Sequence, residues 1–199
     1  MIVKEKIEFA PLTAQEDEKV KLLHKMFCAW VSDLEAAGIA KNKKHSEVDK
    51  DSWDNIIQKQ EIALSYAARA IKMIGGSPKF LDVGCGSGTI MKTVELLGAE
   101  CSGIEFNKEY LPYTKEMDVR YENALETPES FFSEFDIIYM YRPIDNQEKA
   151  LKLLDRVISN MKPNSILITF NYQIEMGILL NKFTELEKLV PFNMVFYKN

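Results

Sequence analysis

The sequence predicts an α/β fold: a doubly wound, mainly parallel sheet with helices on both faces, preceded by an N-terminal helical extension. Three observations lead to this prediction. From Lys79 onward, short apolar runs alternate with segments of helical periodicity, as in consecutive β-α units. A glycine-rich turn joins the first such run to the first such helix. Before residue 75, apolar side chains recur at helical spacing only. We therefore divide the chain into an extension, residues 1–75, and a domain, residues 76–199.

Two helices are expected in the extension. Thr13 and Glu16 have the spacing of a capping box, so a helix should begin there and run to about Ala37. The polar segment 39–51 is rich in lysine, and we interpret it as a solvated loop, with an anion-binding patch as the alternative. The second helix is predicted over residues 52–74, because two glycines and a proline follow it.

The β-α alternation fixes the expected elements of the domain. Strands are expected at 79–84, 100–105, 118–122, 135–141 and 164–170, and helices near 88–97, 107–116 and 146–161. Repeated alternation of this kind implies right-handed crossovers between parallel strands. In the tail, the spacing of apolar residues predicts a helix over 174–190 and a strand over 193–198.

The glycine-rich turn lies in the stretch KFLDVGCGSGTI, residues 79–90. A strand, a glycine turn and a helix in succession direct backbone N–H groups and a helix N-terminus at a ligand. A side chain at Gly84 or Gly86 would fill the space through which that ligand approaches. Position 89 is threonine, so the pattern is G-x-G-x-G with Asp82 before it, and not the G-x-G-x-x-G of nicotinamide folds.

This pattern resembles motif I of the class I S-adenosylmethionine (SAM)-dependent methyltransferases, a strand followed by D-x-G-x-G-x-G. The resemblance implies a methyltransferase that uses SAM and releases S-adenosylhomocysteine. It also implies that Asp82 organises the methionine end of SAM, directly or through water. The residues of the turn that would lie against the cofactor are Gly84, Cys85, Gly86 and Gly88.

Further segments are similar to the same family. Glu105 ends the second strand, where a carboxylate accepts both ribose hydroxyls, and Phe106 follows at the position that packs on adenine. After the third strand, Asn123 stands where the family has an acid near the adenine amino group, and Ala124 leaves room for the ring. Tyr141, at the end of the fourth strand, is expected to line the cofactor site.

The fourth strand departs from one branch of the family. Methyltransferases of planar amines carry N/D-P-P-Y there, whereas this chain has Tyr141-Arg-Pro-Ile144, so DNA adenine methylation is disfavoured. The catalytic residues are unknown: Tyr141 is a weak candidate, and His24 and His45 are candidate bases without a placement. Tyr139 is expected to pack in the core or at its edge. The turn after the helix at 146–161 is similar to the family's L-K-P-G-G, with Asn164 at a position that tolerates left-handed geometry.

Composition restricts the partners and the compartment. The 199 residues are 46% hydrophobic and carry a formal net charge of −5, so long nucleic acid is disfavoured as a partner. Three cysteines without C-x-x-C spacing and two histidines indicate reduced thiols and no metal site. No signal-peptide or transmembrane-length apolar run is present, which predicts a cytoplasmic protein that does not enter a membrane.

Methyl transfer from SAM is the predicted function, and a small or planar acceptor is favoured because the strand ends are aromatic. The extension covers the active site in many relatives of this kind, so Trp30, Trp53 and residues 39–51 are candidates for acceptor contacts. Two alternatives stay open: a non-catalytic SAM- or nucleoside-binding scaffold or activator, and an NAD-dependent oxidoreductase. The sequence identifies neither the acceptor nor the oligomeric state.

Overall fold

The computed structural model describes residues 9–36, 51–141, 143–144, 146–170, 186–188 and 195–198. These residues form a seven-stranded sheet in the order β3-β2-β1-β4-β5-β7-β6. The strands are β1 (Lys79–Val83), β2 (Glu100–Glu105), β3 (Asp118–Tyr121), β4 (Ile137–Tyr141), β5 (Ile166–Phe170), β6 (Leu186–Lys188) and β7 (Val195–Lys198). All pairs from β3 to β5 are parallel, and β7 pairs antiparallel with both β5 and β6. The predicted doubly wound, mainly parallel sheet is confirmed.

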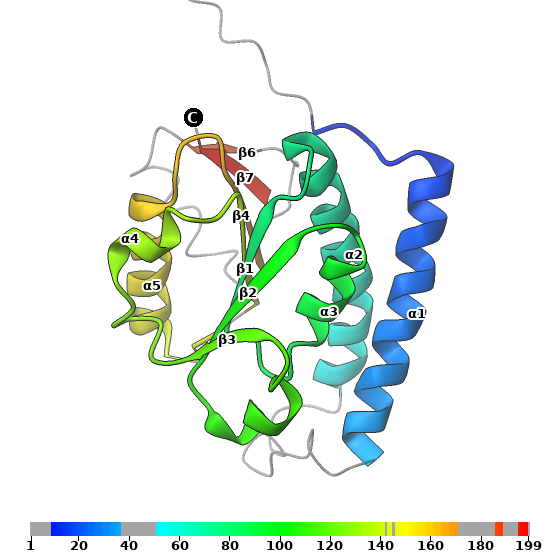
Figure 1. The fold of residues 1–199 in the computed structure, drawn as a ribbon, viewed down its shortest axis with the longest axis horizontal. Helices are drawn as coiled ribbons and strands as arrows, with labels where there is room; N and C mark the ends of the chain where they lie inside the picture. The colour runs from blue at the N-terminus through cyan, green and yellow to red at the C-terminus, as the bar shows by residue number, and fades with distance from the viewer. Residues whose placement is uncertain are drawn as a thin grey trace, which may run out of the picture.

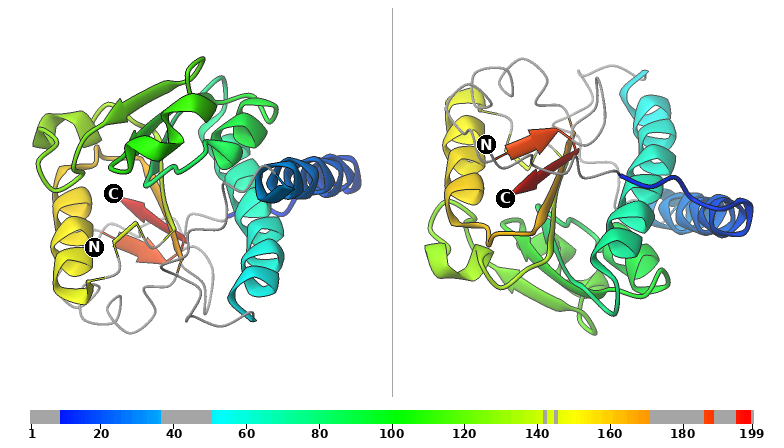
Figure 2. Two further views of the ribbon diagram at one scale, coloured as in Figure 1. Left: turned by 90° about the horizontal axis from the view of Figure 1, so that it is seen from below. Right: turned by 90° about the horizontal axis from the view of Figure 1, so that it is seen from above.

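Helices cover both faces of this sheet (Figures 1 and 2). One face carries α2 (Asp51–Ile74) and α3 (Thr89–Glu95), and the other carries α4 (Glu129–Phe132) and α5 (Gln147–Asn160). The remaining helix, α1 (Ala14–Ala36), lies outside α2 and α3 as a further layer. Its N-terminus has the predicted capping box, since the Thr13 N–H donates to Glu16 at 2.7 Å and the Glu16 N–H donates to Thr13 at 3.3 Å.

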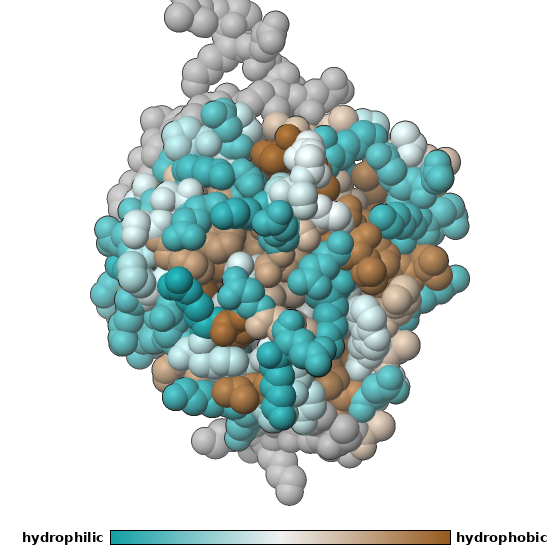
Figure 3. Space-filling view, in the orientation of Figure 1, coloured by the Kyte–Doolittle hydropathy of each residue, from teal (hydrophilic) through white to brown (hydrophobic). Residues whose placement is uncertain are grey.

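The core lies between the sheet and the two helix layers. Every residue of β5 is buried, as are the last four residues of β1, because a parallel strand covered on both faces excludes water along its whole length. The face of the molecule seen in Figure 3 is mostly polar, with apolar residues interspersed over α1 and α3. Among the described residues, no helix is both long and apolar enough to cross a membrane.

Two connections differ from the sequence-based expectation. The segment predicted as a helix over 107–116 is a 3-10 helix, η1 (Lys108–Tyr113), which contains Pro112 and begins at the Asn107 cap. Proline lacks an N–H donor, so this segment forms only a short, tight helix. The four-residue helix α4 was not predicted, since so short a segment shows no periodicity. Asn164 adopts the expected left-handed conformation, with φ 65°.

The tail corrects the helix predicted over 174–190. Residues 186–188 are strand β6, and the predicted strand over 193–198 appears as β7 at 195–198. The rest of the predicted helix falls outside the described residues. Pairing with β7 determines the conformation of β6, and helical spacing in the sequence cannot reveal that long-range contact.

Lys198 on β7 joins the sheet to α5. Its Nζ donates to the carbonyls of Ile158 and Ser159, at 2.8 and 3.3 Å, and the residue is only 9% exposed. These carbonyls belong to the last turn of α5, where the helix leaves acceptors unsatisfied and a cation is favoured. The ammonium group therefore caps α5.

Replacing Lys198 with methionine should keep the buried stem and remove the cap. We expect the free energy of unfolding to fall by about 1–3 kcal/mol, the cost of leaving buried acceptors unsatisfied. Lys152→Met, an exposed site on the same helix, is the matched control and should change stability little. Urea unfolding measures both, and equal midpoints for the two variants would contradict the capping role.

Candidate functional site

The candidate site lies at the carboxyl end of β1, where the strand order reverses. β1 is hydrogen-bonded to β2 on one side and to β4 on the other, and open α/β sheets bind ligands at such a switch point. The glycine turn follows β1 there. Its three glycines have positive φ angles of 81° (Gly84), 53° (Gly86) and 72° (Gly88), which favours glycine at each position.

The glycines differ in what surrounds them. A Cβ on Gly84 would lie 2.6 Å from the Cβ of Pro143, and one on Gly88 would lie 2.4 Å from the sulfur of Met117. A Cβ on Gly86 would meet nothing closer than Tyr110, at 4.0 Å. Packing against Pro143 therefore requires glycine at position 84, whereas a Cβ at position 88 would meet chiefly the flexible end of Met117 and the space beside Gly86 is open to a ligand.

The side chain of Cys85 turns away from that space. Its sulfur lies 2.7 Å from the position of a Cβ on Gly103 of β2, and the residue is buried. Its N–H donates to the Ile104 carbonyl at 3.1 Å. Burial raises the pKa of this thiol well above its usual value, so it stays neutral. Cys85 thus packs beneath the turn.

Glu105 ties the turn to the end of β2. One carboxylate oxygen accepts the Gly86 N–H at 2.8 Å, and the other accepts the Asn107 N–H at 2.6 Å. The side chain is buried, and these two charge-assisted hydrogen bonds hold it at the strand tip. A carboxylate has about four acceptor positions, so capacity remains for ligand hydroxyls.

Asp82 lies below the turn, 3% exposed. Burial, and after it the negative charge of Glu105, together raise the pKa of its carboxyl to about 8. At neutral pH the carboxyl is therefore largely protonated in the free protein. A cationic ligand group beside it would favour the ionised form.

Asp82 should make stability depend on pH. Between about pH 4 and 8 the folded state retains a proton that the unfolded state releases, so stability falls as pH rises through this range. The slope from this group is at most about 1.4 kcal/mol per pH unit. Asp82→Asn should flatten the profile and raise stability at pH 7 relative to the unsubstituted protein. Denaturant unfolding at several pH values measures this, with the exposed Asp33→Asn as control; a similar flattening in both variants would contradict it.

The other predicted residues are placed as follows. Phe106 is 75% exposed next to Glu105, as a stacking platform requires. The Asn123 side chain is engaged locally: its oxygen accepts the Leu125 N–H at 3.1 Å and its amide donates to Glu126 at 2.9 Å. It therefore shapes its own loop, and Ala124 packs half-buried against the core.

The sequence did not single out Tyr110. Its ring carbon Cζ is the atom nearest to the open side of Gly86, and the charges of Glu105 and Glu109 add to burial in raising the pKa of its hydroxyl. Tyr110 lies in η1, directly after β2. Its position after that strand was the only feature of the sequence that could have indicated a place at the site.

Tyr141 is half-buried at the end of β4 and tilts against Phe170, with ring centroids 5.9 Å apart. It lies at the correct edge of the sheet for a site residue. Arg142 falls outside the described residues. Tyr139, two positions earlier, is fully buried, which confirms the prediction that it packs in the core.

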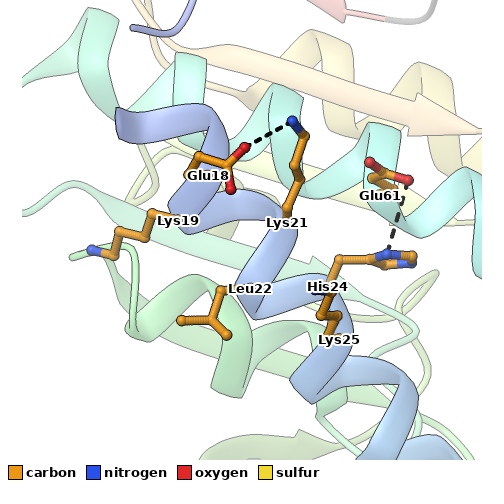
Figure 4. A pocket seen from close by; sticks show the side chains of 7 residues that line it. All are labelled: Glu18, Lys19, Lys21, Leu22, His24, Lys25 and Glu61. Atoms are coloured by element: carbon orange, nitrogen blue, oxygen red, sulfur yellow. Dashed lines mark hydrogen bonds and ion pairs between the residues drawn. The ribbon is translucent and has the colours of Figure 1, made fainter. Parts of the chain in front are cut away.

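His24 lies away from this edge, on the seam between α1 and α2. Its Nδ1 is 3.9 Å from Glu61, its Nε2 is 3.6 Å from the sulfur of Cys28, and its ring stacks on Phe27. A surface hollow of about 640 Å³ lies here, lined mainly by charged side chains of α1 (Figure 4). Apart from His24, none of the residues that line it is a predicted site residue. His45 falls outside the described residues.

The sequence and the fold of this chain are similar to those of known methyltransferases. A family model described as a methyltransferase domain matches residues 76–195. A sequence search among curated proteins finds no match. Among solved structures, magnesium protoporphyrin IX methyltransferase (ChlM) from Synechocystis PCC 6803, solved with bound SAM, aligns with a TM-score of 0.54 at 12% identity, over 75% of this chain and 82% of that one.

Two further structures align less well. The CcbJ methyltransferase from Streptomyces caelestis gives a TM-score of 0.45 at 14% identity, over 52% of this chain and 46% of that one. A SAM-dependent methyltransferase from Archaeoglobus fulgidus gives 0.42 at 21% identity, over 56% of this chain and 57% of that one. The match thus spans about half the length of each of these two proteins.

The family match confirms the predicted resemblance to the methyltransferases. The ChlM alignment independently agrees with the observed fold. Because the family model covers more than half of the sequence, this chain belongs to the methyltransferase-domain family.

Proposed function

We propose that this chain is a SAM-dependent methyltransferase whose cofactor lies in the site formed by Asp82, the glycine turn and Glu105. The observation that carries this proposal is Glu105, which binds the Gly86 N–H beside the open face of that glycine. A nucleoside could therefore approach the turn while its ribose hydroxyls meet an ionised acid. When bound, SAM supplies an electrophilic methyl group.

Different residues of the site would bind different parts of SAM. Glu105 would accept the ribose hydroxyls, Phe106 would stack on adenine, and Asp82 would face the cationic methionine end. Gly86 would allow close approach through its open side. The Asn123 side chain makes its hydrogen bonds within its own loop. We therefore propose that it shapes the part of the site that would hold adenine and does not contact adenine directly.

We further propose that the acceptor is a small or planar molecule bound at the ends of β4 and β5. The half-buried Tyr141 ring borders this region and packs on the buried Phe170, and such rings favour flat partners. Trp30 is placed elsewhere, near Lys92 of α3, and the Trp53 side chain lies outside the described residues. Rate would come from holding the acceptor in line with the methyl group and excluding water.

We also propose a cellular setting and a class of partner for this chain. The three cysteines are free thiols, which supports a reducing compartment and a cytoplasmic location. The net charge of −5 supports an acceptor other than long nucleic acid. A non-catalytic SAM-binding scaffold is the alternative function, since none of the described residues at the site is assigned the role of general base.

Calorimetric titration with SAM, S-adenosylhomocysteine and NADH tests the proposal. Micromolar binding of the two sulfur nucleosides, without NADH binding, is expected. If SAM binds, an acceptor screen that measures S-adenosylhomocysteine release separates an enzyme from a scaffold. Absence of SAM binding would overturn the proposed function, and NADH binding alone would favour the oxidoreductase.

A further inference from the structure

A pair of buried polar side chains lies beneath the candidate site without a role in the function proposed above. Tyr139 of β4 is in register with Asp82 of β1, so the two side chains leave the sheet on the same face. The Tyr139 hydroxyl donates to Oε1 of Gln60, on α2, at 3.3 Å. Tyr139 is 2% exposed and Gln60 is 6% exposed.

Packing alone does not require this hydroxyl. The Tyr139 ring stacks on Phe80 at 6.1 Å and tilts against Phe170 at 6.0 Å between centroids, contacts that a phenylalanine would also make. Burying a hydroxyl costs free energy unless a good hydrogen bond compensates. The 3.3 Å bond to Gln60 exceeds the usual 2.7–2.8 Å for O–H···O bonds, so it compensates only in part.

The Asp82 carboxylate is the group that a hydrogen bond from the Tyr139 hydroxyl could stabilise. The charge of Asp82 adds to burial in raising the pKa of Tyr139, so the two side chains lie within electrostatic reach. On the β2 side, Glu105 opposes ionisation of Asp82, and the thiols of Cys85 and Cys101 stay neutral because burial raises their pKa. α2 contributes the uncharged Gln60. A phenol is both donor and acceptor, and a glutamine amide can take either role, so both groups can reorient around a new charge.

We propose that Tyr139 and Gln60 are positioning residues that stabilise the ionised form of Asp82, which is the form that binds the cationic end of SAM. The hydroxyl turns toward the carboxylate, and the Gln60 amide donates to the hydroxyl in its place. The pair would thereby link α2, in the extension, to the occupancy of the cofactor site. This inference rests on the proposed function, because it assigns a charge to Asp82 in the SAM complex.

The test is the SAM dissociation constant at pH 6, 7, 8 and 9, compared between Tyr139→Phe and the unsubstituted protein. Suppose that the substitution raises by about one pH unit the pH at which Asp82 ionises in the free protein. The variant then binds SAM about tenfold more weakly at pH 7 and less than about twofold more weakly at pH 9. Using the ratio of the two constants at each pH cancels the titration of SAM itself. Tyr197→Phe is the matched control and should give a ratio near one throughout. Tyr197 lies on β7, and its hydroxyl donates a hydrogen bond to Asn164 at 2.6 Å.

Gln60→Leu provides an independent measurement, since it leaves the tyrosine ring in place if Tyr139→Phe fails to fold. It should weaken SAM binding in the same pH-dependent way, and the double variant should be no weaker than Tyr139→Phe alone, because Gln60 acts through Tyr139. A constant ratio across the pH range in both single variants would show a merely structural pair and overturn the inference. Failure of the unsubstituted protein to bind SAM at any pH would instead overturn the proposed function.

Discussion

Replacing Glu105 with alanine is expected to weaken SAM binding by about 100-fold, the largest loss expected from any single carboxylate of the site. Hydrogen bonds to a charged group contribute about 1.5–3 kcal/mol each, and the variant loses those to the ribose. The buried N–H groups of Gly86 and Asn107 also lose their acceptor, so the turn should loosen. S-adenosylhomocysteine should lose as much affinity as SAM, because the two share the ribose.

A second variant separates binding from folding. Glu105→Gln retains the shape and one acceptor oxygen, so stability should fall less than in the alanine variant while affinity still drops. Glu100→Gln, at the exposed start of the same strand, is the control and should bind SAM normally. Calorimetry measures affinity and urea unfolding measures stability. Unchanged SAM affinity in both Glu105 variants would refute the site assignment.

Substituting Gly84 should have the largest effect on the fold. Alanine there adds the strain of a positive φ angle, about 1 kcal/mol, and a Cβ that overlaps Pro143, about 1–3 kcal/mol more. From the sequence, a side chain at Gly84, such as that of valine, is expected to fill the space through which the ligand approaches. The 2.6 Å approach of Pro143 changes this expectation, because valine would displace the segment that follows β4.

Gly86→Ala is the sharper test of the cofactor site. Its Cβ enters open space, so only the strain of the φ angle, about 1 kcal/mol, should reduce stability, while the methyl group obstructs the ligand. Gly76→Ala is the matched control, since Gly76 has φ 65° with nothing within 4 Å and precedes β1, whereas the turn follows the other end of that strand. Urea unfolding should rank Gly84→Ala as least stable. Loss of SAM binding in Gly76→Ala but not in Gly86→Ala would contradict this assignment.

Local patterns in the sequence were sufficient to predict the cofactor half of the fold. The apolar run before the glycines, the spacing of Asp82 and Gly84, and the acid at position 105 all lie within one β-α-β unit. Such a unit has short-range signals, and its strands are buried on both faces, so the sequence shows uninterrupted apolar runs.

Contacts between distant segments could not be predicted in this way. Tyr139 and Gln60 are 79 positions apart, and nothing near either residue indicates the other. The Cys85 side chain can point inward because Gly103 has no side chain there. These two residues meet only because β1 pairs with β2. Likewise, Asn123 was assigned to the ligand by analogy, whereas its neighbour Glu126 binds its amide.

The position of β7 has a consequence for biosynthesis. β7 lies inside the sheet, between β5 and β6, although both of those strands precede it in the chain. Until residues 195–198 have left the ribosome, β5 has an unpaired edge, and all five of its residues are destined for burial. An exposed apolar edge invites pairing with other chains. The nascent protein should therefore be most prone to aggregation in the interval between synthesis of β5 and arrival of β7, even though the nucleoside-binding half of the sheet is already complete.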